Sequence, residues 1–297
     1  MKILVVLINS GNYVSRYVLR LILKINQINR TEKTGVSADW VSLVDYMAKN
    51  QDEYDVLIYN TFPDETCPVK FAKELTAQCD KKFNTFKGMK ILLDTHDNGT
   101  RDGFVRFNDL TFPRIKVNPS YEMIGRMNLV ITIPYIVYPI YNYPAVDRPY
   151  KLVCAMRTRN MPVTRLKIFD AIKQFNPIGG HINITEHARR LRQTWINVVS
   201  TGNGDSSLSH VDTLAAGALL LAEENIKRIK ILPYADLEDG VNFVSYNLEN
   251  VVEKLTDLMG HPDKVDSIRA NGLKTFTIGY DILRNARQLV TWIINNK

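Results

Sequence analysis

The chain has 297 residues, of which 45% are hydrophobic and 23% charged, which is the composition of an ordinary globular protein with one large or two medium domains. No apolar run approaches the roughly 20 residues of a membrane-spanning helix, and three cysteines at unrelated spacings argue against a disulfide framework or a zinc site. The opening apolar run is too short for the core of a secretion signal, so we expect a cytoplasmic protein.

The first half alternates short apolar strands with helical or irregular stretches. Strands are predicted at 2–8, 54–59, 89–93 and 129–134, and an amphipathic helix over 14–28, where apolar residues recur every three or four positions. This pattern is typical of a parallel sheet that is covered on both faces. Residues 134–150 carry four prolines with tyrosines between them, which predicts a linker that lies against protein.

The second half restarts the pattern. Strands are predicted at 151–156, 195–200, 218–222 and 243–246, and helices at 163–175, 209–216, from 247, at 262–270 and at 280–295. Asn271 and Gly272 are interpreted as the stop of the helix that begins at Pro262. The sequence therefore predicts an α/β protein of two Rossmann-like domains, 1–145 and 146–297, with a central cleft and a last helix that can pack on the first domain.

The net charge of +7 is concentrated in one segment. Residues 151–192 hold nine basic and two acidic side chains, which account for the whole excess. Such a patch predicts an anionic partner, whether phosphate, nucleic acid or a lipid surface. Arg157, Arg159 and Arg165 flank a strand-to-helix turn, where guanidinium groups suit phosphate oxygens.

The most informative stretch is 199–246, which reads as a strand, a glycine-containing loop, a helix start and a second strand. Gly202 and Gly204 allow close approach of the backbone to a ligand, and free N–H groups at a helix start favour phosphate. A carboxylate at Asp212, about one turn into the helix, is placed to accept bonds from ribose hydroxyls. The candidate ligand-binding residues of this segment are Thr201, Gly202, Asn203, Gly204, Asp205, Ser206, Ser209, His210 and Asp212.

Two parts of this region resemble the donor-binding domain of GT-B glycosyltransferases. The run SHVDTLAAGALLLAEE is similar to the family's Glu-Ala-x-Ala-x-Gly segment with its following apolar strand, and ILPYADLEDGVNFVSYNLENVVEKLTDLM resembles exostosin-like members. The resemblance covers about the last 100 residues. It implies a UDP- or GDP-linked sugar as donor, with Asp212 in the place of the family's ribose-binding glutamate. Many retaining members carry a second glutamate where this chain has Gly204, so an inverting enzyme is expected.

The first half supplies candidates for a catalytic base. An inverting transfer needs one group to take the proton of the acceptor hydroxyl as that oxygen attacks the anomeric carbon. The run LLDTHDNGTRDG follows a predicted strand and offers Asp97 as first candidate, then His96 and Asp94, with Asp64 in reserve. A turn around Asp97 that serves only the backbone is the competing interpretation.

The sequence contains no Asp-x-Asp triplet, the motif of metal-dependent nucleotide-sugar enzymes of another fold, so we expect no metal and no cofactor besides the donor. An oligosaccharide or glycoconjugate is the expected acceptor, nucleic acid is not expected as a partner, and peripheral membrane contact stays open. Three alternatives remain: a nucleic-acid-binding protein that uses the basic patch, a non-catalytic two-lobed sugar-binding protein, and another nucleotide-using enzyme such as an epimerase.

Overall fold

A computed structural model gives the fold of the chain. The residues that it describes are 1–8, 13–60, 70–95, 112–141, 147–154, 163–179, 183–201 and 206–297. They form two compact units. The described residues up to Ile136, together with Asp281–Lys297, make up the first unit, and those from Val137 to Tyr280 make up the second. The predicted boundary at 145/146 lies nine residues after the first crossing of the chain.

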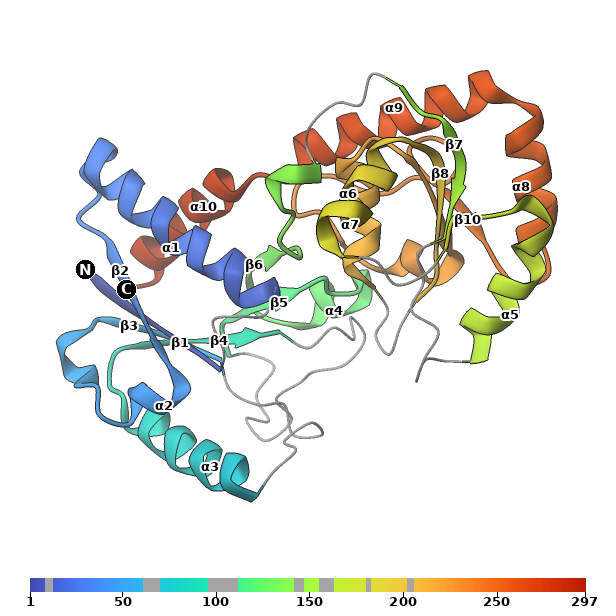
Figure 1. Cartoon of the computed structure of the whole chain (residues 1–297). Helices are drawn as coiled ribbons and strands as arrows, with labels where there is room; N and C mark the ends of the chain where they lie inside the picture. The colour runs from blue at the N-terminus through green and yellow to red at the C-terminus, as the bar shows by residue number, and fades with distance from the viewer. Residues whose placement is uncertain are drawn as a thin grey trace. The chain divides into compact units, whose positions relative to one another are not determined.

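The first unit is built on a six-stranded sheet in which all neighbouring strands are parallel. Its order is β2 (Ser37–Ser42), β1 (Lys2–Leu7), β3 (Val56–Tyr59), β4 (Met89–Asp94), β5 (Arg114–Val117) and β6 (Leu129–Ile133). Helices α1 (Tyr13–Glu32) and α10 (Ile282–Asn296) lie on one face, and α2 (Leu43–Tyr46) and α3 (Lys70–Thr85) on the other (Figure 1). The short helix α4 (Tyr121–Arg126) links β5 to β6.

Helix α10 belongs to the first unit although the chain reaches it from the second. It packs against α1 and β6. The buried amide of Asn285 donates to the Tyr17 hydroxyl over 2.7 Å and to the Thr132 carbonyl over 3.1 Å. Because a buried amide needs partners, these two bonds fix the helix at one position on the sheet.

The second unit has a four-stranded parallel sheet. Its order is β10 (Val244–Tyr246), β9 (Leu219–Glu223), β8 (Thr194–Val199) and β7 (Tyr150–Val153). One face packs on α6 (Ile184–Arg192), α7 (Leu208–Ala215) and part of α9 (Pro262–Gly279), the other on α5 (Val163–Ile172), α8 (Val251–Gly260) and the start of α9. Short 3-10 turns complete the chain: η1 (Gln51–Glu53), η3 (Pro139–Tyr141), η4 (Lys173–Phe175) and η5 (Glu224–Arg228).

Alternate residues of the strands enter the two cores of the second unit. Leu220 and Ala222 of β9 lie in one cluster, and Leu219 and Leu221 lie in the other. A strand that is buried on both faces reads as a continuous apolar run, which is how β9 was predicted from the sequence. The predicted α/β class is confirmed.

The predicted helix stop at Asn271-Gly272 is wrong, because α9 continues to Gly279. A Cβ at Gly272 would lie 2.8 Å from the Asn242 carbonyl oxygen and 3.2 Å from Leu214 Cδ2. The glycine therefore permits close packing of the helix on its neighbours, and it does not end the helix.

In the described part of the chain, no helix is both long enough and apolar enough to cross a membrane.

Candidate functional site

The carboxyl end of β8 is fastened by side chains from three other elements. The Tyr246 hydroxyl of β10 donates to the Val199 carbonyl over 3.1 Å. Arg165 of α5 donates to the carbonyls of Thr201 over 2.7 Å and Ser200 over 3.2 Å. The backbone N–H of Thr201 donates to Glu223 Oε2 over 2.6 Å, and the Thr201 hydroxyl donates to the same oxygen. These bonds fix the direction in which the chain enters the glycine segment.

Two of the candidates from the sequence, Arg165 and Thr201, therefore take part in the hydrogen bonds at the end of β8. The Arg165 guanidinium is buried and holds two backbone carbonyls, and its burial lowers its pKa while the nearby Glu223 raises it. Whether Arg165 also binds a diphosphate stays a prediction. Glu223 and Tyr246 were not singled out in the sequence. A carboxylate directly after a buried strand was the signal for Glu223.

Helix α7 begins with a reciprocal capping arrangement between Ser207 and His210. The Ser207 backbone N–H donates to His210 Nδ1 over 2.9 Å. Since Nδ1 accepts this bond, the hydrogen of the neutral ring is assigned to Nε2. Burial lowers the His210 pKa to about 4, which keeps the ring neutral near pH 7. His210 is fully buried, and among the described residues its Nε2 has no hydrogen-bond partner.

The side chain of Asp212 is also buried, with a relative exposure of 6% for the residue. Burial raises the pKa of this carboxyl well above its ordinary value, and a hydrogen bond from Tyr141 opposes that shift. The second carboxyl oxygen, Oδ1, has no partner among the described residues. A buried acid with a perturbed pKa and an open oxygen is a candidate for ligand binding.

The remaining described candidates of this segment lie around the same helix start. Ser206 is buried directly before the cap, and Ser209 is half-buried in the first turn. The Ser209 carbonyl accepts a bond from the Thr213 hydroxyl, which in turn accepts from Asn197 of β8 over 2.7 Å. The sequence candidates that lie outside the described residues are Asp64, His96, Asp97, Arg157, Arg159, Gly202, Asn203, Gly204 and Asp205.

Asp94 is a candidate that lies in the first unit. It ends β4 and forms an ion pair with Lys116 of β5 over 3.1 Å, and both side chains are fully buried. A carboxylate whose charge is already compensated by a buried lysine is poorly placed to take a proton from an acceptor. Asp94 as a base stays a prediction, and Lys116 is the partner that sequence reasoning missed.

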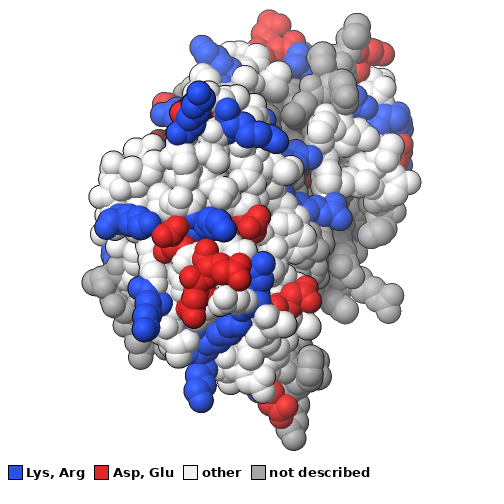
Figure 2. Space-filling model, turned by 90° about the vertical axis from the view of Figure 1, so that its left-hand side faces the viewer, with Lys and Arg blue, Asp and Glu red and all other residues white. Residues whose placement is uncertain are grey.

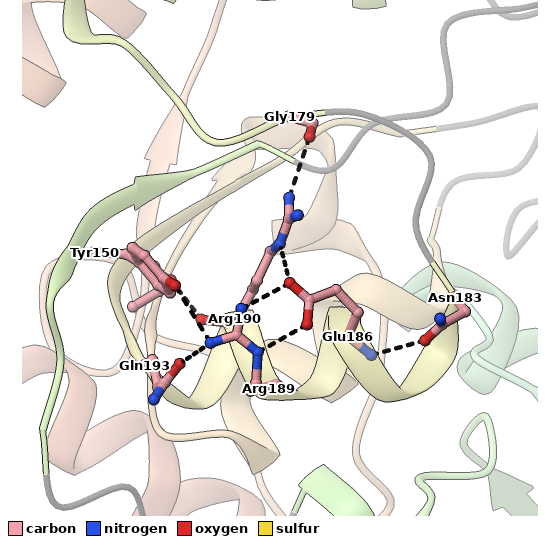
Figure 3. Close-up of polar contacts among 8 residues, drawn as sticks. Tyr150, Gly179, Asn183, Glu186, Arg189, Arg190 and Gln193 are labelled. Atoms are coloured by element: carbon pink, nitrogen blue, oxygen red, sulfur yellow. Dashed lines mark hydrogen bonds and ion pairs between the residues drawn. The ribbon is translucent and has the colours of Figure 1, made fainter.

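The basic patch is partly neutralised by its own acid. Glu186 of α6 pairs with both Arg189 and Arg190 over 2.7 Å (Figure 3). Arg189 also donates to Tyr150 and Gln193, and Arg190 donates to the Gly179 carbonyl. These arginine bonds hold the Glu186 pKa at about 2. On the face drawn in Figure 2, basic and acidic side chains are interspersed. Two arginines of the patch are therefore engaged within the protein.

Among the described residues, no group of three or more His, Cys, Asp or Glu side chains is arranged to hold a metal ion.

Comparisons with known proteins give likeness at the level of the fold. No protein-family profile matches the sequence, and no curated protein matches it. HepE from Anabaena, solved in complex with UDP, is 11% identical over 99% of this chain and 100% of its own, with a TM-score of 0.60. Sucrose-phosphate synthase from Thermosynechococcus elongatus is 10% identical with full coverage of both chains and a TM-score of 0.65.

A third similar structure is an alpha-glucosyltransferase in complex with UDP-glucose and DNA containing an abasic site. It is 11% identical over 98% of each chain, with a TM-score of 0.57. These neighbours are glycosyltransferases of GT-B fold, so the predicted GT-B fold of two Rossmann-like domains is confirmed for this chain.

Proposed function

We propose that this chain is a glycosyltransferase that moves a sugar from a nucleoside diphosphate to a hydroxyl of a carbohydrate acceptor. The observation that carries the proposal is helix α7, which follows the glycine segment. It bears two buried polar atoms, His210 Nε2 and Asp212 Oδ1, that have no hydrogen-bond partner among the described residues. Buried polar atoms without partners are costly, and a bound ligand can supply the missing bonds. The GT-B fold supports this assignment.

The donor is proposed to lie against the start of α7. The helix dipole at this end favours the diphosphate, with Arg157 and Arg159 as further phosphate ligands. Asp212 takes the ribose. The UDP bound by HepE makes a UDP-linked sugar the first donor to test, followed by a GDP-linked one. No cofactor besides this donor is proposed.

The transfer is proposed to invert the anomeric configuration. A base takes the proton of the acceptor hydroxyl while that oxygen bonds to the anomeric carbon, and the bond from this carbon to the diphosphate oxygen breaks with its electron pair leaving on the nucleotide. Asp97 is the first candidate for the base and His96 the second. Asp94 comes last because its carboxylate is buried against Lys116.

The reaction is proposed to need no metal, because the sequence lacks an Asp-x-Asp triplet and offers arginines and a helix start for the leaving charge. A nucleic-acid acceptor is less favoured, since Glu186 already pairs two arginines of the basic patch. The DNA in the third neighbour nevertheless makes DNA the natural second acceptor to include.

The test is a thermal-shift and calorimetric screen with UDP, GDP and their common sugars, in EDTA and in Mg²⁺. Selective stabilisation by one nucleotide in EDTA, lost in Asp212→Ala, is expected. A donor so identified is then incubated with glycan and DNA acceptors, and the anomeric configuration of the product is read by NMR. No stabilisation by any nucleotide contradicts the proposal, and a product with retained configuration contradicts the inverting mechanism.

A further inference from the structure

A chain of hydrogen bonds leads from Asp212 to a histidine on another helix. One oxygen of the Asp212 carboxyl accepts from the Tyr141 hydroxyl, while Oδ1 has no partner among the described residues. The Tyr141 hydroxyl also lies 2.9 Å from His187 Nδ1, and the two rings meet edge to face with centroids 5.9 Å apart. Tyr141 comes from η3, His187 from α6 and Asp212 from α7, so only the fold brings them together.

Because Tyr141 has a single hydroxyl hydrogen, the hydrogen bonds that link Asp212, Tyr141 and His187 must run in one direction. When Tyr141 donates to Asp212, it cannot also donate to His187, so His187 Nδ1 must carry a hydrogen and donate to the tyrosine oxygen. A neutral histidine has such a tautomer, and burial together with the nearby Arg190 lowers the His187 pKa and favours the neutral ring. With this direction Asp212 is left as an acceptor.

We propose that Tyr141 and His187 are positioning residues that orient the Asp212 carboxylate so that its Oδ1 receives a ribose hydroxyl of the nucleoside diphosphate. This inference rests on the proposed function and adds two residues that no sequence motif identified. Among the described residues, the hydrogen bond from Tyr141 is the one interaction that favours the ionised form of Asp212. Removal of this bond should therefore weaken the acceptor that the ribose needs.

The experiment measures the affinity for UDP and for 2′,3′-dideoxy-UDP by calorimetry, with GDP and its dideoxy analogue in parallel. Tyr141→Phe and His187→Leu each remove a hydrogen bond of this series, whereas His187→Asn keeps a donor close to the position of Nδ1. Tyr150→Phe is the matched control. The Tyr150 hydroxyl accepts from Arg189, which lies on the same helix as His187, and it takes no part in the hydrogen bonds between Asp212, Tyr141 and His187 (Figure 3).

We expect Tyr141→Phe and His187→Leu to weaken binding of the ribonucleotide about 5- to 20-fold and to change binding of the dideoxy analogue less than about twofold. His187→Asn should restore most of the loss, and Tyr150→Phe should have no effect. The unchanged dideoxy affinity also shows that the variants are folded. Equal losses for both nucleotides, or no loss for either, overturn the inference alone. Failure of the unaltered protein to bind any of these nucleotides overturns the proposed function and this inference with it.

Discussion

At the scale of single residues, helix α7 bears two of the buried side-chain atoms that have no hydrogen-bond partner among the described residues. His210 Nε2 and Asp212 Oδ1 lie two positions apart on one eight-residue helix. By contrast, the nearby Arg165 and Glu223 form hydrogen bonds with backbone groups at the end of β8. The first pair is therefore expected to cost stability, and the second to provide it.

Asp212→Asn should stabilise the protein while weakening its binding of nucleotide. Burial raises the folded-state pKa of this carboxyl, so its ionisation opposes folding once the pH rises above the unfolded value near 3.8. The amide has no such charge. We expect the variant to gain about 1–2 kcal/mol in free energy of unfolding at pH 7, and little or nothing at pH 3.5. Urea denaturation at both pH values measures this gain. A loss at pH 7 would show that the native carboxylate is well compensated.

Asp94→Ala should be strongly destabilising, because it removes the carboxylate that compensates the buried charge of Lys116. The expected loss is about 3–5 kcal/mol. Replacement of both residues, as in Asp94→Leu with Lys116→Met, should recover most of it, since neither charge then remains in the core. Urea denaturation of the two single variants and the double variant gives the coupling. Equal stability of Asp94→Ala and the unaltered protein would contradict the burial of this pair.

At the scale of elements, the fold requires a glycine where a neighbouring element lies too close to leave room for a Cβ atom. Gly272 lies inside α9 against the Asn242 carbonyl, whereas a Cβ at Gly125 of α4 would meet nothing within 4 Å. The two positions therefore form a matched pair for the same substitution.

Gly272→Ala should lower the free energy of unfolding by about 1–3 kcal/mol, because the added methyl group clashes with backbone that cannot move freely. Gly125→Ala should raise it by about 0.5–1 kcal/mol through helix propensity alone. Thermal unfolding of both variants tests the contrast. A stabilising Gly272→Ala would contradict the close contact of α9 with the Asn242 carbonyl.

At the scale of the whole molecule, the chain completes its first unit only at its end. Residues 1–145 lack α10 and therefore leave α1 and β6 without the helix that packs on them. We expect a fragment of residues 1–145 to be unfolded or aggregated. A fragment of 1–136 joined to 281–297 by a few flexible residues should fold, because the Val137 N–H lies 3.0 Å from the Tyr280 hydroxyl where the chain crosses and returns. Circular dichroism of the two fragments measures the difference, and a folded 1–145 would contradict this role of α10.

The sequence by itself determined the α/β class, most strands and the helix predicted at 209–216, because these follow from local periodicity, capping and glycine placement. It did not predict β2 or β5. Asp39 and Trp40 of β2 are exposed, and β5 carries the buried charges Arg114 and Lys116, so neither strand reads as a simple apolar run.

Only the tertiary structure decided which polar groups meet. Arg165 contacts the end of β8 from 35 residues away, Tyr141 contacts Asp212 from another element, and Asp94 finds Lys116 on the neighbouring strand. Periodicity reports which face of an element is buried, but the partner of a buried polar group depends on strand order and helix packing. For the same reason α9 continues through Gly272, since the contact that requires this glycine is made by a loop distant in sequence.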